Sequence, residues 1–139
     1  MATLYDSLVA DAVGAGSPTQ SILSKIDHVH PLTDIGAAVE YTATSPAAIP
    51  ADVNVIELNH ATVAIEKTIG SLSDHKGLMV IKNTSASGTA AHKITVTTGT
   101  WDGTNKVITL NAPKECLVVF IDSAGNGTII INVGAVGLA

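Results

Sequence analysis

The sharpest metal-binding arrangement in the chain is a pair of histidines separated by one residue. His28 and His30 stand in the run Asp27-His28-Val29-His30. On an extended strand, side chains two residues apart point to the same face, so both imidazoles could bind one metal ion. On a threefold axis, three copies would supply six imidazoles. The alternative that we favour is a polar turn before Pro31, with histidines bonded to backbone carbonyls at an interface and no metal bound.

The remaining histidines show no catalytic spacing. His60, His75 and His92 lie far apart in the sequence, and none stands beside an acid and a nucleophile at a recognised catalytic spacing. A triad is assembled by the fold rather than by spacing, yet the chain has neither a Gly-x-Ser-x-Gly elbow nor a His-Glu-x-x-His motif. We therefore expect that this protein is not an enzyme. A small jelly-roll hydrolase or sugar-modifying enzyme would require one of these histidines to meet a carboxylate in a pocket.

No cofactor or metal is expected from the other polar motifs. Asp122 and Asn126 bracket a glycine-rich turn that could hold calcium, but the dense oxygen spacing of a calcium loop is missing. The run 125–127, Gly-Asn-Gly, leads into no expected helix and is therefore a turn rather than a phosphate loop. Cys116 is the only cysteine, which excludes an internal disulfide and a cysteine zinc site, and we expect it to be buried.

The composition indicates that much of the protein's surface contacts other protein rather than water. Hydrophobic residues make up 46% of the 139 residues and charged residues only 14%, against roughly 25% in ordinary domains. The chain has no arginine and a net charge of -5, so we expect no nucleic-acid partner. No apolar stretch approaches the roughly 20 residues that span a bilayer, and the first residues lack a positive n-region, so we expect neither a membrane partner nor a secretory signal.

Short runs rich in Val, Ile and Thr predict an all-β domain over residues 37–139. About eight strands, with turn residues between them, favour an antiparallel β-sandwich of the jelly-roll type. The expected strands are 39–44, 53–58, 62–68, 78–83, 92–98, 106–110, 116–122 and 128–133. The run 101–105, Trp-Asp-Gly-Thr-Asn, predicts a hairpin, and we expect Trp101 to cap the end of the core rather than to form an exposed contact.

Two of these strands are apolar on both faces. The stretches 117–121 and 129–131 contain no polar alternation, so both faces need cover. In a domain this small, the opposite sheet covers one face. The other face would then be covered by a second subunit or by the chain's own N-terminal arm.

We expect residues 1–36 to form an N-terminal arm, which is an extended segment that contains short helical turns. Leu4, Leu8 and Ala12 recur at four-residue spacing, and Ser17-Pro18 followed by Ile22 and Ile26 is typical of a capped helical turn. Such short pieces cannot bury their apolar faces alone, so we expect the arm to pack on a neighbour or on its own body. The candidate interaction residues are Leu4, Tyr5, Leu8, Ile22, Ile26, His28 and His30.

The runs TTGTWDGTNKVITLNAP (97–113) and CLVVFIDSAGNGT (116–128) resemble small jelly-roll virion proteins of tailed bacteriophages. The resemblance is to head decoration (capsid cement) proteins and head-fibre modules, covers residues 53–139, and lies in the pattern of strands, turns and small residues. It implies a homotrimer, synthesised in the host cytoplasm, that binds the outer capsid surface where major capsid protein subunits meet. It implies no catalytic residues, and the arm would reach the capsid or a neighbouring subunit.

The alternative virion role is a tail-fibre or baseplate module that binds a receptor. Glycan receptors usually need exposed aromatic platforms. The chain has only four aromatic residues, Tyr5, Tyr41, Trp101 and Phe120, so we rank this role below capsid decoration.

Overall fold

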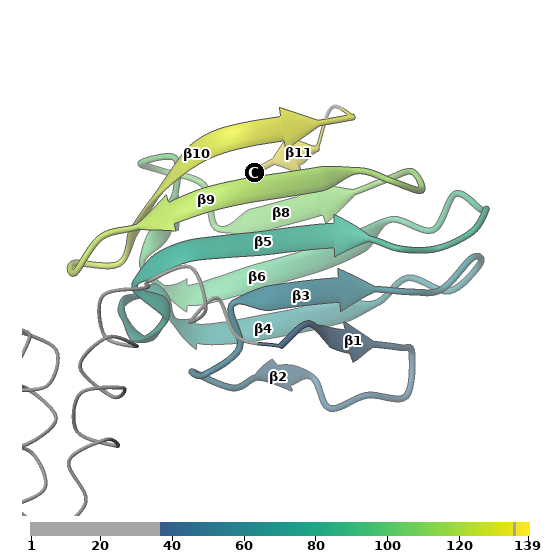
Figure 1. Cartoon of the computed structure of the whole chain (residues 1–139), viewed down its shortest axis with the longest axis horizontal. Helices are drawn as coiled ribbons and strands as arrows, with labels where there is room; N and C mark the ends of the chain where they lie inside the picture. Colours follow the sequence, from purple (N-terminus) through teal and green to yellow (C-terminus); the bar gives the residue numbers. More distant parts are fainter. Residues whose placement is uncertain (1–36, 135) are drawn as a thin grey trace, which may run out of the picture. The chain divides into compact units, whose positions relative to one another are not determined.

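A computed structural model of the chain describes residues 37–134 and 136–139, which form two facing β-sheets (Figure 1). Sheet A has the strand order β1-β3-β5-β9-β10-β7, and sheet B the order β11-β8-β6-β4-β2. The strands of sheet A are β1 (Val39–Tyr41), β3 (Val55–Leu58), β5 (Gly77–Asn83), β9 (Cys116–Ile121), β10 (Asn126–Val133) and β7 (Thr100–Trp101). Those of sheet B are β11 (Gly137–Leu138), β8 (Val107–Leu110), β6 (His92–Thr98), β4 (Glu66–Ser71) and β2 (Ala48–Ile49).

The predicted all-β sandwich is confirmed, and each of the eight expected strands overlaps an observed one. Three further strands, β2, β7 and β11, are only two residues long, which is too short for an alternation to show in the sequence. Within the described residues, the only helical piece is the 3-10 helix η2 (Leu72–His75). The expected arm, residues 1–36, lies outside the described part of the chain.

The expected antiparallel pairing is wrong for the first half of the domain. In sheet A, β1 pairs with β3 and β3 with β5, all parallel, and in sheet B the pairs β2–β4 and β4–β6 are also parallel. From β1 to β6 the chain alternates between the sheets, so that it winds as a coil (Figure 1). Parallel pairing follows because every connection crosses to the opposite sheet, and each strand therefore runs beside the strand two before it.

The second half is mainly antiparallel, and its β9–β10 connection is a tight turn that stays within sheet A. Strand β9 lies between β5 and β10 and is antiparallel to both, while β8 is antiparallel to β6 and β11. The β9–β10 turn uses Gly125 at a φ of 83°. The predicted hairpin at 101–105 is confirmed, since the amides of Trp101 and Asn105 each donate to the other's carbonyl oxygen, at 2.7 and 3.0 Å. The sheets are therefore mixed, unlike those of the expected jelly roll.

The core lies between the sheets and is built mainly from aliphatic side chains that alternate along the strands. In β4 and β6, every second residue points inward and is buried. Trp101 is also fully buried within this core, so it is not an exposed contact residue; that it caps the end of the core stays a prediction. The largest fully buried side chains are Trp101, Ile56, Leu58, Ile65, Ile69, Leu72, Met79, Ile81, Ile94, Ile108, Leu110 and Leu117.

Candidate interaction surface

The outward side of sheet A carries rows of apolar side chains. Residues that oppose each other in register point to the same side of a sheet, so the pairing defines these rows directly. The middle row is apolar across four strands and consists of Val55, Val80, Val118 and Ile131. In the next row, Leu78 of β5 opposes Phe120 of β9, and these residues are 42% and 48% exposed. We call these residues, together with Ile130 and Val133, the outer face of sheet A.

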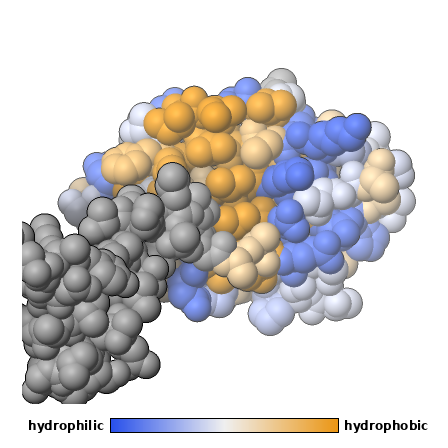
Figure 2. All heavy atoms as spheres, viewed as in Figure 1, coloured by the Kyte–Doolittle hydropathy of each residue, from blue (hydrophilic) through white to orange (hydrophobic). Residues whose placement is uncertain are grey.

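An irregularity in β10 adds to this surface. The pairing of β10 with β9 shifts between Ile129, which opposes Val119, and Ile131, which opposes Val118. Ile130 is the extra residue at this β-bulge and is 56% exposed. A bulge breaks the alternation of a strand, so here two successive isoleucines are exposed. Figure 2 shows the result as a hydrophobic band that crosses the strands of sheet A.

The third row on the outward side of sheet A contains polar side chains and borders the hydrophobic band. Glu40 of β1 opposes Glu57 of β3, and Glu57 opposes Lys82 of β5. Lys82 in turn opposes Cys116, which opposes Val133. Cys116 is therefore on the outward side and only partly buried, contrary to the expectation that it lies in the core. In Figure 2 the hydrophobic band gives way to hydrophilic residues on the right of the view. A polar rim around an apolar centre is the usual anatomy of a protein interface.

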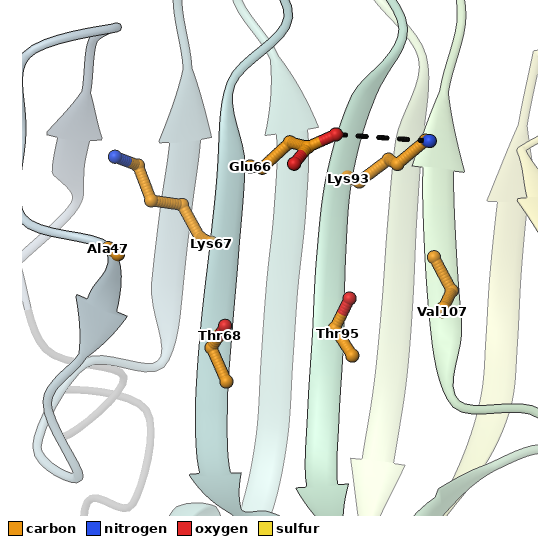
Figure 3. A pocket seen from close by; sticks show the side chains of 7 residues that line it. All are labelled: Ala47, Glu66, Lys67, Thr68, Lys93, Thr95 and Val107. Atoms are coloured by element: carbon orange, nitrogen blue, oxygen red, sulfur yellow. Dashed lines mark ion pairs between the residues drawn. The ribbon is translucent and has the colours of Figure 1, made fainter.

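The outward side of sheet B is polar. Its rows pair Glu66 with Lys93 and Thr68 with Thr95. The Glu66 and Lys93 side chains form an exposed ion pair with 3.9 Å between Nζ and Oε1 (Figure 3). Threonines and paired charges are well solvated, so this side needs no cover. The two outer faces of the sandwich therefore differ in character, and only that of sheet A presents exposed large hydrophobic residues in rows.

An open hollow of about 470 Å³ lies over sheet B (Figure 3). Its lining consists of Ala47, Glu66, Lys67, Thr68, Lys93, Thr95 and Val107. Ligand sites are mostly apolar clefts with a few convergent polar groups, whereas here Glu66 is paired with Lys93 and no aromatic ring lines the hollow. Lys67 is itself buried, and its Nζ donates to the carbonyl oxygen of Ser45 at 2.7 Å. The hollow therefore offers no evident substrate site.

The fold brings His60 and His92 together around Ser85. The backbone amide of His60 donates to Ser85 Oγ at 3.0 Å, and Ser85 Oγ donates to the His60 carbonyl oxygen at 3.1 Å. His92 Nε2 lies 3.4 Å from Ser85 Oγ, and His92 Nδ1 accepts from the Ile65 amide at 3.1 Å. Burial lowers the pKa of His92, so the ring is neutral at pH 7.

This serine–histidine contact is buried and connects neighbouring loops. Ser85 and His92 are both buried, and their polar atoms bond to the backbone of neighbouring loops. Among the described residues, neither side chain forms a hydrogen bond with a carboxylate. Sequence reasoning did not single out Ser85, since an isolated serine in the run Thr-Ser-Ala-Ser carries no signal for its partners.

His75 lies in a separate environment. Its Nδ1 donates to the carbonyl oxygen of Val53 at 3.0 Å and lies 3.2 Å from Asn54 Oδ1. Burial lowers the pKa of His75, although the Val53 carbonyl, Asp74 and Asp52 oppose this shift. The three histidines therefore do not converge on one site.

The turn at Asp122 uses its carboxylate as a cap. Asp122 Oδ1 accepts from the amides of Ala124 and Asn126, both at 2.9 Å, and Oδ2 accepts from Asn126 Nδ2 at 3.1 Å. The bonds from Asn126 are the main reason that the pKa of Asp122 is lowered. Both oxygens thus serve the turn, as expected for an Asx-type motif. Across 37–134 and 136–139, no three His, Cys, Asp or Glu residues lie close enough to hold a metal ion.

The seven interaction residues predicted in the arm lie outside the described residues. These are Leu4, Tyr5, Leu8, Ile22, Ile26, His28 and His30. None of the helical structure in the described part of the chain has the length and apolar character needed to cross a bilayer.

Comparisons of the chain with protein-family models, with curated proteins and with solved structures find no match.

Proposed function

We propose that this protein is a non-enzymatic structural virion protein that binds the outer surface of a phage capsid and stabilises it. The observation that carries the proposal is the outer face of sheet A, a band of exposed Leu, Ile, Val and Phe side chains on a domain whose opposite face is polar. Scattered apolar residues on a surface need no explanation, but a contiguous patch marks an interaction site. The low charged content of 14% supports the same proposal.

The proposed mechanism is repeated weak attachment. Each Å² of apolar surface removed from water contributes about 25 cal/mol, so one small patch gives modest affinity after the cost of association is subtracted. Symmetric repetition of the contact, in the homotrimer implied by the resemblance, raises the overall avidity. The decorated shell binds the protein and a disrupted shell does not, so binding stabilises the shell by mass action. The partners in this proposal are the major capsid protein and further copies of the chain.

A tail-fibre or baseplate module that binds a receptor remains the second candidate. It receives less support from the described residues, because Tyr41 and Trp101 are buried and Phe120 is the one aromatic side chain with substantial exposure there. A glycan platform usually needs more than one such ring.

The test is attachment to shells assembled from the major capsid protein that is encoded in the same genome. Full-length protein is mixed with purified shells, and the bound fraction is measured after gradient sedimentation. We expect saturable binding and shells that resist heating better than bare shells. A protein that stays at the top of the gradient at every concentration would contradict the proposal.

The same experiment also tests the role of the predicted N-terminal arm. Deleting residues 1–36 should leave a folded β domain, because the described strands form two facing sheets around a shared core. The same deletion should abolish attachment to shells, because we expect the arm to reach the capsid or a neighbouring subunit. A truncated protein that still decorates shells would contradict this role of the arm.

A further inference from the structure

We infer that a second copy of this chain covers the outer face of sheet A, an inference that rests on the proposed function and names the partner of its surface. The exposed large side chains of this face are Leu78, Phe120, Ile130, Ile131 and Val133, which are 42–56% exposed. Such a patch is on the order of 500 Å², at the upper end of the range found on monomers. A standard interface buries about 800 Å² on each partner, so this patch would form its apolar centre.

The edges of the sheets are poor sites for adding another chain. Strand β1 has three residues, while β2, β7 and β11 have two each. Because β7 pairs with β10 at Asn126 and Gly127 alone, the rest of β10 is also an edge, and it carries the bulge at Ile130. Pro46 and Pro50 flank β2 and cannot donate a backbone hydrogen bond. Short edge strands, flanking prolines and β-bulges all discourage strand addition. Association through the face of sheet A is therefore favoured over extension of either sheet.

The charge pattern of the face suits a second copy. The charged side chains of its rows, Glu40, Glu57 and Lys82, all lie in the third row, so the two apolar rows carry no charge. Two copies that meet through these apolar rows therefore bring no like charges together at the centre of the contact, despite the net charge of -5 on each chain. A nucleic acid or an anionic membrane surface would instead require a basic patch. An uncharged apolar centre can therefore pack against the apolar residues of a second copy.

The packing of one sheet on another also matches this geometry. Sheets pack face to face about 10 Å apart, with the side chains of the two faces interdigitating. The outer face of sheet A has a central row of mainly small valine side chains, Val55, Val80 and Val118, which ends at Ile131. The larger side chains of Leu78 and Phe120 form the neighbouring row. A second copy would bury these rows in the same way that sheet B buries the inner side of sheet A.

The first test is the solution mass of the full-length protein, measured by light scattering after size exclusion. We expect a multiple of the chain mass of 14.1 kDa. Phe120→Lys and Ile131→Lys each place a charge in the apolar band and should reduce the mass to that of one chain. Thr95→Lys is the matched control, because it adds the same charge to a central strand on the polar side of sheet B, and it should leave the oligomer intact.

Cys116 supplies a second readout that does not depend on mass. It lies on the outward side of β9, in the row with Lys82 and Val133. Its reaction with a thiol reagent should be at least tenfold slower in the wild-type oligomer than in Phe120→Lys, while circular dichroism shows that both remain folded. Equal reaction rates would mean that this face is open in the oligomer and would overturn the inference.

The outcomes separate this inference from the proposed function. A monomeric wild-type protein overturns the second copy as occupant; if that monomer still binds shells, the capsid protein or the arm covers the face. An oligomer that both Lys substitutions dissociate, but that fails to bind shells, supports the inference and contradicts capsid decoration. An oligomer that survives both substitutions overturns the inference, because its interface would lie elsewhere.

Discussion

Replacing His92 should destabilise the domain by removing a buried hydrogen-bond acceptor. His92 is fully buried, and its Nδ1 accepts from the Ile65 amide at 3.1 Å. Because Ser85 Oγ gives its own hydrogen to the His60 carbonyl oxygen, the remaining hydrogen of a neutral His92 belongs on Nε2, which faces Ser85. The ring therefore joins the loops before β4 and β6, and it does so in its neutral form.

The expected size of the effect follows from the group left behind. In His92→Leu the side chain keeps most of its bulk, but the amide of Ile65, a residue with only 1% exposure, loses its acceptor. An unsatisfied buried amide costs about 1–3 kcal/mol. His92→Asn can offer an amide oxygen near the former Nδ1 position and should recover part of this loss. Both changes lower the free energy of unfolding without touching either outer face.

Urea denaturation followed by the fluorescence of Trp101 measures this loss. Trp101 is the only tryptophan and is fully buried, so its emission reports exposure of the core. The comparison is made at about pH 8, well above the lowered pKa of His92. A His92→Leu variant as stable as wild type would refute the reasoning, because it would mean that the Ile65 amide finds another partner.

The same histidine makes stability depend on pH. Burial lowers the folded-state pKa of His92 and of His75 below the value of about 6.5 expected in the unfolded chain. Below about pH 6.5 the unfolded chain therefore binds more protons, so the free energy of unfolding is highest above this pH and falls as the solution is acidified. His92→Leu should show a shallower decline than wild type between about pH 7 and pH 5. A flat wild-type profile over that interval would contradict this account.

Three further predictions test the core, the coil and the arm. Leu117→Ala should cost about 2–5 kcal/mol in urea denaturation because Leu117 is fully buried, whereas Leu78→Ala on the outer face should cost the isolated chain under about 1 kcal/mol. Gly88→Ala should lower the melting temperature, since its φ of 109° and a neighbouring backbone carbonyl both disfavour a β-carbon. Replacing His28 and His30 with Ala should leave the solution mass unchanged, and loss of the oligomer together with a bound metal would contradict our interpretation of this pair.

The sequence by itself determined the strands and the faces they present. Alternating Val, Ile and Thr with turn residues between them located eight strands, because a period of two is a local property of the chain. The run 117–121 was predicted to be apolar on both faces. In the structure, Leu117 and Val119 do point into the core while Val118 and Phe120 point outward. What covers the outward residues stays a prediction.

Only the tertiary structure decided how the strands pair and which distant polar groups meet. A period of two is the same in parallel and antiparallel strands, so alternation could not reveal the coil from β1 to β6, which depends on where each connection crosses. The bulge at Ile130 and the contact between Ser85 and His92 were equally hidden, because each depends on the register of strands or loops far apart in the sequence. Local residue patterns set the strand faces, whereas long-range register set the surface that we propose as the interface.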